Sequence, residues 1–163
     1  MGKRAFLHIL THPSFDTDYL QANYDLMELW LQSPNQEKME TLRPNLKQTS
    51  DVCKMRWDLS KLKMAPSGVY KMHQTLQITQ HIYQEIKDFS QMHDFIQLDY
   101  NETHNEIQKM IRFIEDRFVL ENACLNNQYG NYDSPVIKSG LYPDLDKLYQ
   151  EHETDNRHLD AIR

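Results

Sequence analysis

Apolar residues recur every three or four positions along most of the chain, which is the spacing of one face of an α-helix. The longest run predicts a helix that begins at Pro66, in the first turn, and extends to about residue 88. Its apolar face consists of Val69, Met72, Leu76, Ile82 with Tyr83, Ile86 and Phe89. A helix this long with one apolar face is expected to lie at the centre of a helical core.

A second clear run follows the sequence Thr103-His-Asn-Glu106, which has the pattern of a capping box at a helix start. The apolar face that it introduces is Ile107, Met110, Ile111, Ile114 and Phe118. We therefore predict a second long helix that begins near Thr103 and packs through this face.

The remaining helices are predicted from shorter runs and from their boundary residues. They cover residues 3–11; a segment that starts at Asp16 or Thr17 and ends at Pro34; residues 36–46, interrupted by Pro44; a segment capped by Ser50 with Val52, Met55, Leu59 and Leu62; and a last one from Pro143. Residues 122–133 are expected to form a loop, and "PVIK" a strand. The prediction is an all-α fold of about seven helices, with one short strand-like segment near 135–138.

The last predicted helix differs from the others because no stop signal follows it. Its apolar positions Leu145, Leu148, Leu159 and Ile162 continue to the end of the chain without a Gly or Asn cap. We divide the chain into a helical core domain, residues 1–140, and the start of a longer helix, residues 141–163.

Composition narrows the class of protein. The 163 residues carry a net charge of −6, whereas a stand-alone nucleic-acid binder usually has a basic excess. The basic stretch 37–63 and the acidic stretch 141–163 are interpreted as solvated helix faces. The cysteines at 53 and 124 are far apart and favour reduced, buried thiols inside a cell. No apolar run approaches a membrane span, and no signal peptide is evident, so an intracellular protein without membrane contact is expected.

Candidate chemistry is sparse. His8 and His12 lie four positions apart and could share a metal, but no third ligand accompanies them, nor does one accompany His73 and His81. The glycines form no phosphate-binding loop, and the adjacent carboxylates Glu115 and Asp116 point in different directions on a helix. The residues themselves therefore indicate no catalytic residue, cofactor site or metal site.

The order of the segments resembles that of the core domain of MutS-family DNA mismatch-repair proteins. "MGKRAFLHILTHPSFDTDYLQANYDLMELWL" is similar to the opening of that domain, and "LKQTSDVCKMRWDLSKLKMAPSGVYKMHQTL" to its short helix followed by a long one. "SPVIKSGLYPDLDKLYQE" is similar to the entry into the lever helix, where Ile137, Gly140, Leu145, Asp146 and Leu148 match. The resemblance spans nearly all of the chain. The departures, such as Lys54 at a common Arg position and Leu141-Tyr142-Pro143, indicate a divergent branch.

The resemblance implies a mechanical task for a core and lever segment. In the family, this region couples an ATPase domain to a clamp that closes on DNA. ATP, magnesium and most of the contact with duplex DNA would belong to other domains, so this segment is not expected to be an enzyme. Partners would be those domains and a MutS-type dimer partner. The residues expected to carry the coupling are Val69, Met72, Leu76, Ile82, Ile86, Leu145, Leu148, Leu159 and Ile162.

Two other functions can be weighed against the same residues, and only the first fits them. A stand-alone helical module could present an apolar groove to a helix of a protein partner, with no role on DNA. A metal- or cofactor-binding bundle would need Glu-x-x-His pairs on facing helices, and the chain has none.

Overall fold

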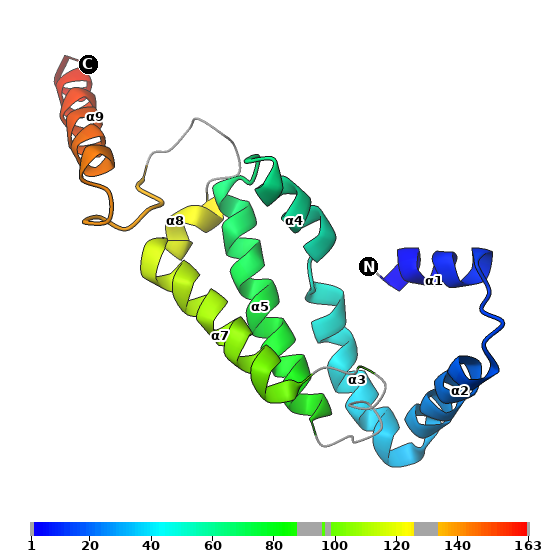
Figure 1. The fold of residues 1–163 in the computed structure, drawn as a ribbon. Coiled ribbons are helices and arrows are strands. Elements are labelled where there is room, and N and C mark those ends of the chain that lie inside the picture. Colours follow the sequence, from blue (N-terminus) through cyan, green and yellow to red (C-terminus); the bar gives the residue numbers. More distant parts are fainter. Residues whose placement is uncertain (1, 88–95, 97–98, 126–133, 163) are drawn as a thin grey trace.

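A computed structural model describes residues 2–87, 96, 99–125 and 134–162, and these ranges form helices with no strand among them (Figure 1). The all-α class is thus confirmed. The helices are α1 (Gly2–Thr11), α2 (Thr17–Leu31), α3 (Ser33–Gln48), α4 (Val52–Ser60), α5 (Pro66–Ile86), α7 (Tyr100–Arg117), α8 (Leu120–Leu125) and α9 (Pro143–Ile162). Phe89, predicted to extend the apolar face of α5, lies outside the described residues.

Helix α5 is the centre of the bundle, as its length and apolar face predict. Helices α3, α4, α7 and α8 all contact α5, while α2 contacts α3 (Figure 1). The buried apolar side chains are Leu42, Ile86, Ile107, Ile111, Ile114, Ala123 and Val136. Ile107, Ile111 and Ile114 are spaced by four and three, so they lie on one face of α7. Ile114, at 2% exposure, is the largest fully enclosed side chain of the described residues.

The starts of three helices are set by aspartates. Asp16, Asp51 and Asp99 cap α2, α4 and α7, and each carboxylate accepts a backbone N–H from the first turn. The prediction for α7 was therefore wrong, because Thr103 and Glu106 lie inside a helix that Asp99 had already begun. The predicted cap of α4, Ser50, was also wrong by one residue, because Asp51 is the cap.

The C-terminal end of α4 also differs from the prediction. The helix stops at Ser60, and Leu62 has a φ of +54° and is 92% exposed, so it is not part of the apolar face. The Lys61 ammonium instead lies 4.0 Å from the centre of the Trp57 ring, a cation–π contact that covers the last turn.

Two prolines occupy different places from those predicted for them. Helix α2 ends at Leu31, and Pro34 stands in the first turn of α3, where a missing N–H has no cost. Pro44 lies inside α3 at an exposed position, so water can solvate the carbonyl that loses its intrahelical donor. Helix α3 is consequently longer than the predicted range 36–46.

Residues 120–125 and 134–138 also depart from the expected pattern, while residues 126–133 of the predicted loop lie outside the described residues. Leu120–Leu125 form α8 where the loop was predicted, because Ala123 is fully buried and fixes this turn against α5. The segment 135–138 makes one isolated antiparallel bridge, between Phe118 and Ile137, rather than a strand.

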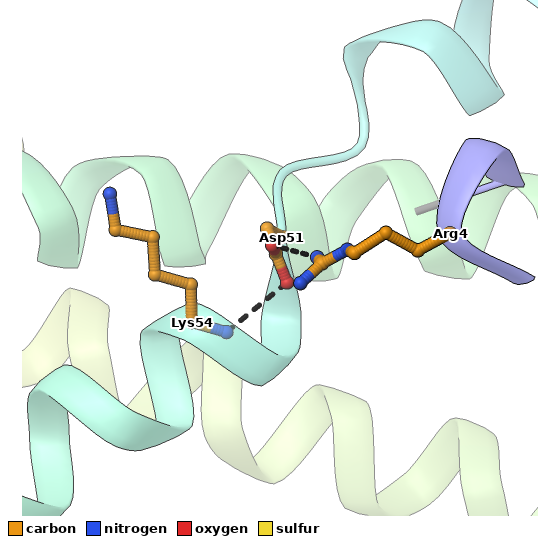
Figure 2. Close-up of polar contacts among 3 residues, drawn as sticks. All are labelled: Arg4, Asp51 and Lys54. Carbon is orange, nitrogen blue, oxygen red and sulfur yellow. Dashed lines mark hydrogen bonds and ion pairs between the residues drawn. The ribbon is translucent and has the colours of Figure 1, made fainter.

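Helices α1 and α9 lie at opposite ends of the molecule, outside the packed bundle (Figure 1). An ion pair between Arg4 of α1 and Asp51 links α1 to the start of α4 (Figure 2). The apolar side chains of α1, Phe6, Leu7, Ile9 and Leu10, are each about 60% exposed. The link is therefore polar, and α1 adds little to the core.

Candidate functional site

The base of α9 is fixed to the bundle through the segment that precedes it. The N–H of Val119 donates to the carbonyl of Val136 at 2.8 Å, and the N–H of Lys138 donates to the carbonyl of Arg117 at 2.9 Å. The Asn122 side chain donates to the Pro135 carbonyl at 2.7 Å. These bonds hold residues 135–138 against the junction of α7 and α8, and Val136 is buried there.

A sharp turn at Gly140 separates this fixed segment from α9. Gly140 has a φ of +89°, a conformation that side chains with a Cβ adopt only with strain. Its N–H donates to a carboxylate oxygen of Asp146 in the first turn of α9 at 2.8 Å. The turn and the helix start are thus joined by one hydrogen bond, which orients α9 relative to residues 135–138.

The first two turns of α9 rest on an apolar surface that we name the α9 seat. It is lined by Met64, Pro66, Val69, Phe118, Val136, Ile137, Leu145 and Tyr149, and it surrounds an open cavity of about 330 Å³. A water molecule occupies roughly 30 Å³ in the liquid, so this contact is loosely packed. The seat is therefore apolar and incompletely filled by the first two turns of α9.

Beyond the seat, α9 stands in solvent. Residues 150–159 are all exposed, and Leu148 and Leu159 are 61% and 63% exposed. They lie eleven positions apart, close to three full turns, and so share one face. Leu148 lies at the edge of a shallow pocket with Ile137 and Tyr142. The side chain of Ile162 lies outside the description.

The expected coupling residues consequently do not form one site, because they are spread over the α9 seat, a separate groove, the core and the exposed face of α9. Val69 and Leu145 both line the α9 seat. Met72 and Leu76 line a different surface, the α4–α5–α7 groove, together with Val52, Met55, Arg56, Leu59, Ser60, Thr75 and Met110. Ile82 is half-buried, and Ile86 is buried in the core.

His73 is a site residue that the sequence pattern did not single out as part of the core. It is buried in α5, at 6% exposure, and its Nε2 lies 2.9 Å from a carboxylate oxygen of Glu115 on α7. The signal was present, because His73 follows Val69 by four positions and therefore lies on the same helix face. This bond joins the two longest helices of the bundle and fixes their register.

One carboxylate at the edge of the bundle has a shifted pKa. The Lys54 backbone N–H, 3.1 Å from an oxygen of Asp51, lowers the pKa of that carboxyl, and the Arg4 guanidinium lowers it further against the effect of desolvation (Figure 2). Asp51 thus serves both as the cap of α4 and as the anchor of α1. On α7, the Glu106 carboxylate, 2.6 Å from the Lys109 ammonium, raises the pKa of that lysine.

Other candidates from the sequence are placed apart. His8 and His12 stack on α1 with ring centres 4.6 Å apart, and no group of three metal-ligating side chains occurs in the part of the chain that the structure describes. Both cysteines are free and exposed, so their interpretation as buried apolar residues was wrong. Within the described ranges, no helix is long and apolar enough to cross a membrane.

Comparison with protein-family models, with curated proteins and with solved structures gives no match to this chain.

Proposed function

We propose that the chain is the core and lever segment of a MutS-like DNA mismatch-repair protein. Its task would be to couple an ATPase domain and a DNA clamp, neither of which lies in this chain. The ordered resemblance of its segments to the MutS core domain suggests the family. One observation of the fold carries the mechanical part: α9 leaves the bundle from a loose apolar seat beyond a glycine turn.

A lever requires a stiff arm and a joint with more than one packed arrangement. Helix α9, with 20 residues, is a strut about 30 Å long. The joint would be the α9 seat, where Val69 and Tyr149 line an incompletely filled cavity. Leu148 and Leu159 would contact a neighbouring domain, because they find no cover in the bundle. ATP and magnesium would bind elsewhere in the parent protein, and duplex DNA would be gripped chiefly by other domains.

The decisive genetic test is the sequence that follows this segment in its gene. The proposal requires a returning lever helix and then a GxxxxGK[ST] loop that binds ATP. A gene without that loop would rule out the family. The isolated chain should bind duplex DNA weakly and hydrolyse no ATP; tight binding that falls steeply with salt would contradict the assignment of DNA contacts to other domains.

A distance measurement tests the lever itself. Cys53 on α4 is exposed and can carry one spin label, while Cys124→Ser removes the other thiol and Asn156→Cys places the second label on α9. In the full-length protein, nucleotide and mismatched DNA should shift the distance between the two labels. A control pair inside the bundle, Cys53 with Asn105→Cys on α7, should remain unchanged. An unchanged distance to α9 in every state would exclude a moving lever.

The alternative is a stand-alone helical module that binds a protein partner. The α4–α5–α7 groove is the observation that favours it.

A further inference from the structure

The α4–α5–α7 groove is an apolar depression outside the α9 seat. Helix α4 forms one wall and α7 the other, while Met72 and Leu76 of α5 form the floor; its volume is about 520 Å³. Val52, Leu59 and Met110 at its rim are 45–47% exposed although they are apolar. Half of each of these side chains is therefore still available to a partner.

The polar groups of the groove are almost all occupied. The Thr75 hydroxyl donates to the carbonyl of Lys71 at 2.8 Å, and the Ser60 hydroxyl donates to the carbonyl of Trp57 at 3.0 Å. Arg56 is the exception, because it has no ion pair with any residue of the described ranges. A ligand of this groove would thus meet an apolar surface and one free guanidinium.

The wall that carries Arg56 is positively charged. Residues 51–63 contain four bases, Lys54, Arg56, Lys61 and Lys63, and two acids, Asp51 and Asp58. Asp51 is already paired with Arg4 of α1, so it does little to offset these bases (Figure 2). A partner with carboxylates beside its apolar side chains would match this wall.

We propose that the α4–α5–α7 groove binds an acidic amphipathic helix of a protein partner, with a carboxylate of that helix paired to Arg56. The wall residues Val52, Met55 and Leu59 span seven positions, about 10.5 Å of helix. Anchors at i, i+3 or i+4, and i+7 of a bound helix span the same length. Met55, Met72 and Met110 supply adaptable side chains, which suit a surface that must fit around such anchors. The inference goes beyond the MutS-like assignment and does not depend on it.

Helix α9 of a second copy is a poor fit for the same groove. It is acidic and has exposed leucines, but the positions that follow Leu148 by three, four and seven are Glu151, His152 and Asp155. The required anchors are therefore missing.

The experiment uses the whole chain and two labelled 18-residue helical peptides in a fluorescence anisotropy titration. Both peptides carry leucines at positions 4, 8 and 11; one has glutamates flanking them and the other has lysines. The glutamate peptide should bind saturably and at least about tenfold more tightly than the lysine peptide. Added salt should narrow the difference, because the contact to Arg56 is at the rim.

Three variants locate the site. Met110→Glu places a charge in the apolar wall and should abolish binding of the glutamate peptide. Arg56→Glu should reverse the preference between the two peptides. Arg112→Glu makes the same charge change at an exposed position of α7 outside the groove lining, and it should leave binding unchanged. Circular dichroism checks that each variant is folded, and all three positions are exposed enough to tolerate the change.

Several results would overturn the proposal. The first is no binding of the glutamate peptide at a peptide concentration of 1 mM, which is roughly the weakest affinity worth assigning to a site. The second is equal binding of both peptides, and the third is an unchanged preference in Arg56→Glu. A further contradicting result would come from sedimentation equilibrium, which measures whether the chain forms a dimer. A dimer that Met110→Glu dissociates would show that a second copy, not a partner helix, fills the groove.

Discussion

A matched pair of truncations, Ile114→Ala and Leu159→Ala, separates the bundle from the arm of α9. Both changes remove three carbon atoms from a helical residue. Ile114 is 2% exposed in the core, whereas Leu159 is 63% exposed on α9. If α9 stands free of the bundle, the two substitutions should have very different effects on the free energy of unfolding.

The magnitudes follow from burial. Removing three buried carbons from Ile114 loses about 2.4 kcal/mol of transfer free energy, at roughly 0.8 kcal/mol for each. The cavity left behind adds to this, so the total should fall within about 2–5 kcal/mol. Leu159 has only about a third of its side chain buried, so the same sum gives about 0.9 kcal/mol at most, and the better helix propensity of Ala reduces it.

Urea unfolding followed by circular dichroism at 222 nm measures both values. The midpoint should fall clearly for Ile114→Ala and hardly at all for Leu159→Ala, with the slope m unchanged in both. In a domain of this size, the first variant should also lose roughly 4–20 °C in melting temperature. A loss of 2 kcal/mol or more in Leu159→Ala would refute the reasoning, since it would mean that the distal part of α9 packs against the chain.

Three further predictions concern the polar and backbone contacts. His73→Ala should destabilise the protein by about 1–3 kcal/mol in urea unfolding, because it opens a cavity and leaves Glu115 without its partner. A loss smaller than that from a His→Ala change at an exposed position would contradict the role of His73 in fixing the register of α5 and α7. Since the pKa of the Asp51 carboxyl is lowered by folding, its stabilising effect should be complete above its ordinary value near 3.8 and be lost as the pH falls below that value. Hydrogen exchange of α1 should then increase at low pH in the wild type but be already fast and insensitive to this titration in Arg4→Ala. Gly140→Ala meets no atom within 4 Å, so its cost should be the backbone strain alone, about 1–2 kcal/mol at a φ of +89°, and a neutral result would show that the turn is not held in this conformation.

The periodic helices were the part of the fold that the pattern predicted best. Pro66 placed the first turn of α5 correctly, but of its predicted apolar face only Ile86 is buried. The other buried residues of this helix are the polar Ser67, His73 and Thr75, whereas Val69, Met72, Leu76 and Ile82 are half-buried. The isoleucines of α7, in contrast, identified the face that is buried. Helix periodicity records which side chains avoid water, and that information is local to each segment.

Boundaries were predicted less well, because several residues can cap the same helix. The Thr103–Glu106 pattern was a plausible start, but Asp99 lay four residues earlier and began α7 first. Leu62 matched the spacing of α4, yet the chain had already turned at Lys61. Competition between neighbouring caps depends on where the preceding chain must go, which a short window does not contain.

The candidate sites show the same division. Val69 and Leu145 were both expected to matter, but they line the same cavity only because residues 136–138 return to the end of α7. Arg56, Thr75 and Met110 lie on three helices, and no spacing in the sequence relates them. Glu115 was considered only as the neighbour of Asp116, and the packing of α7 on α5 brings it to His73.

By itself, the sequence determined the helical class, the inner face of α7 and the polar character of α9, because all three depend on the residues within one segment. Only the tertiary structure decided which faces are covered. In that structure, helices surround α5 on several sides, the leucines of α9 lie in solvent, and a groove lies between α4 and α7. The reason is physical. Apolar side chains on one face of a helix favour burial of that face, but whether another segment covers it depends on the path of the rest of the chain.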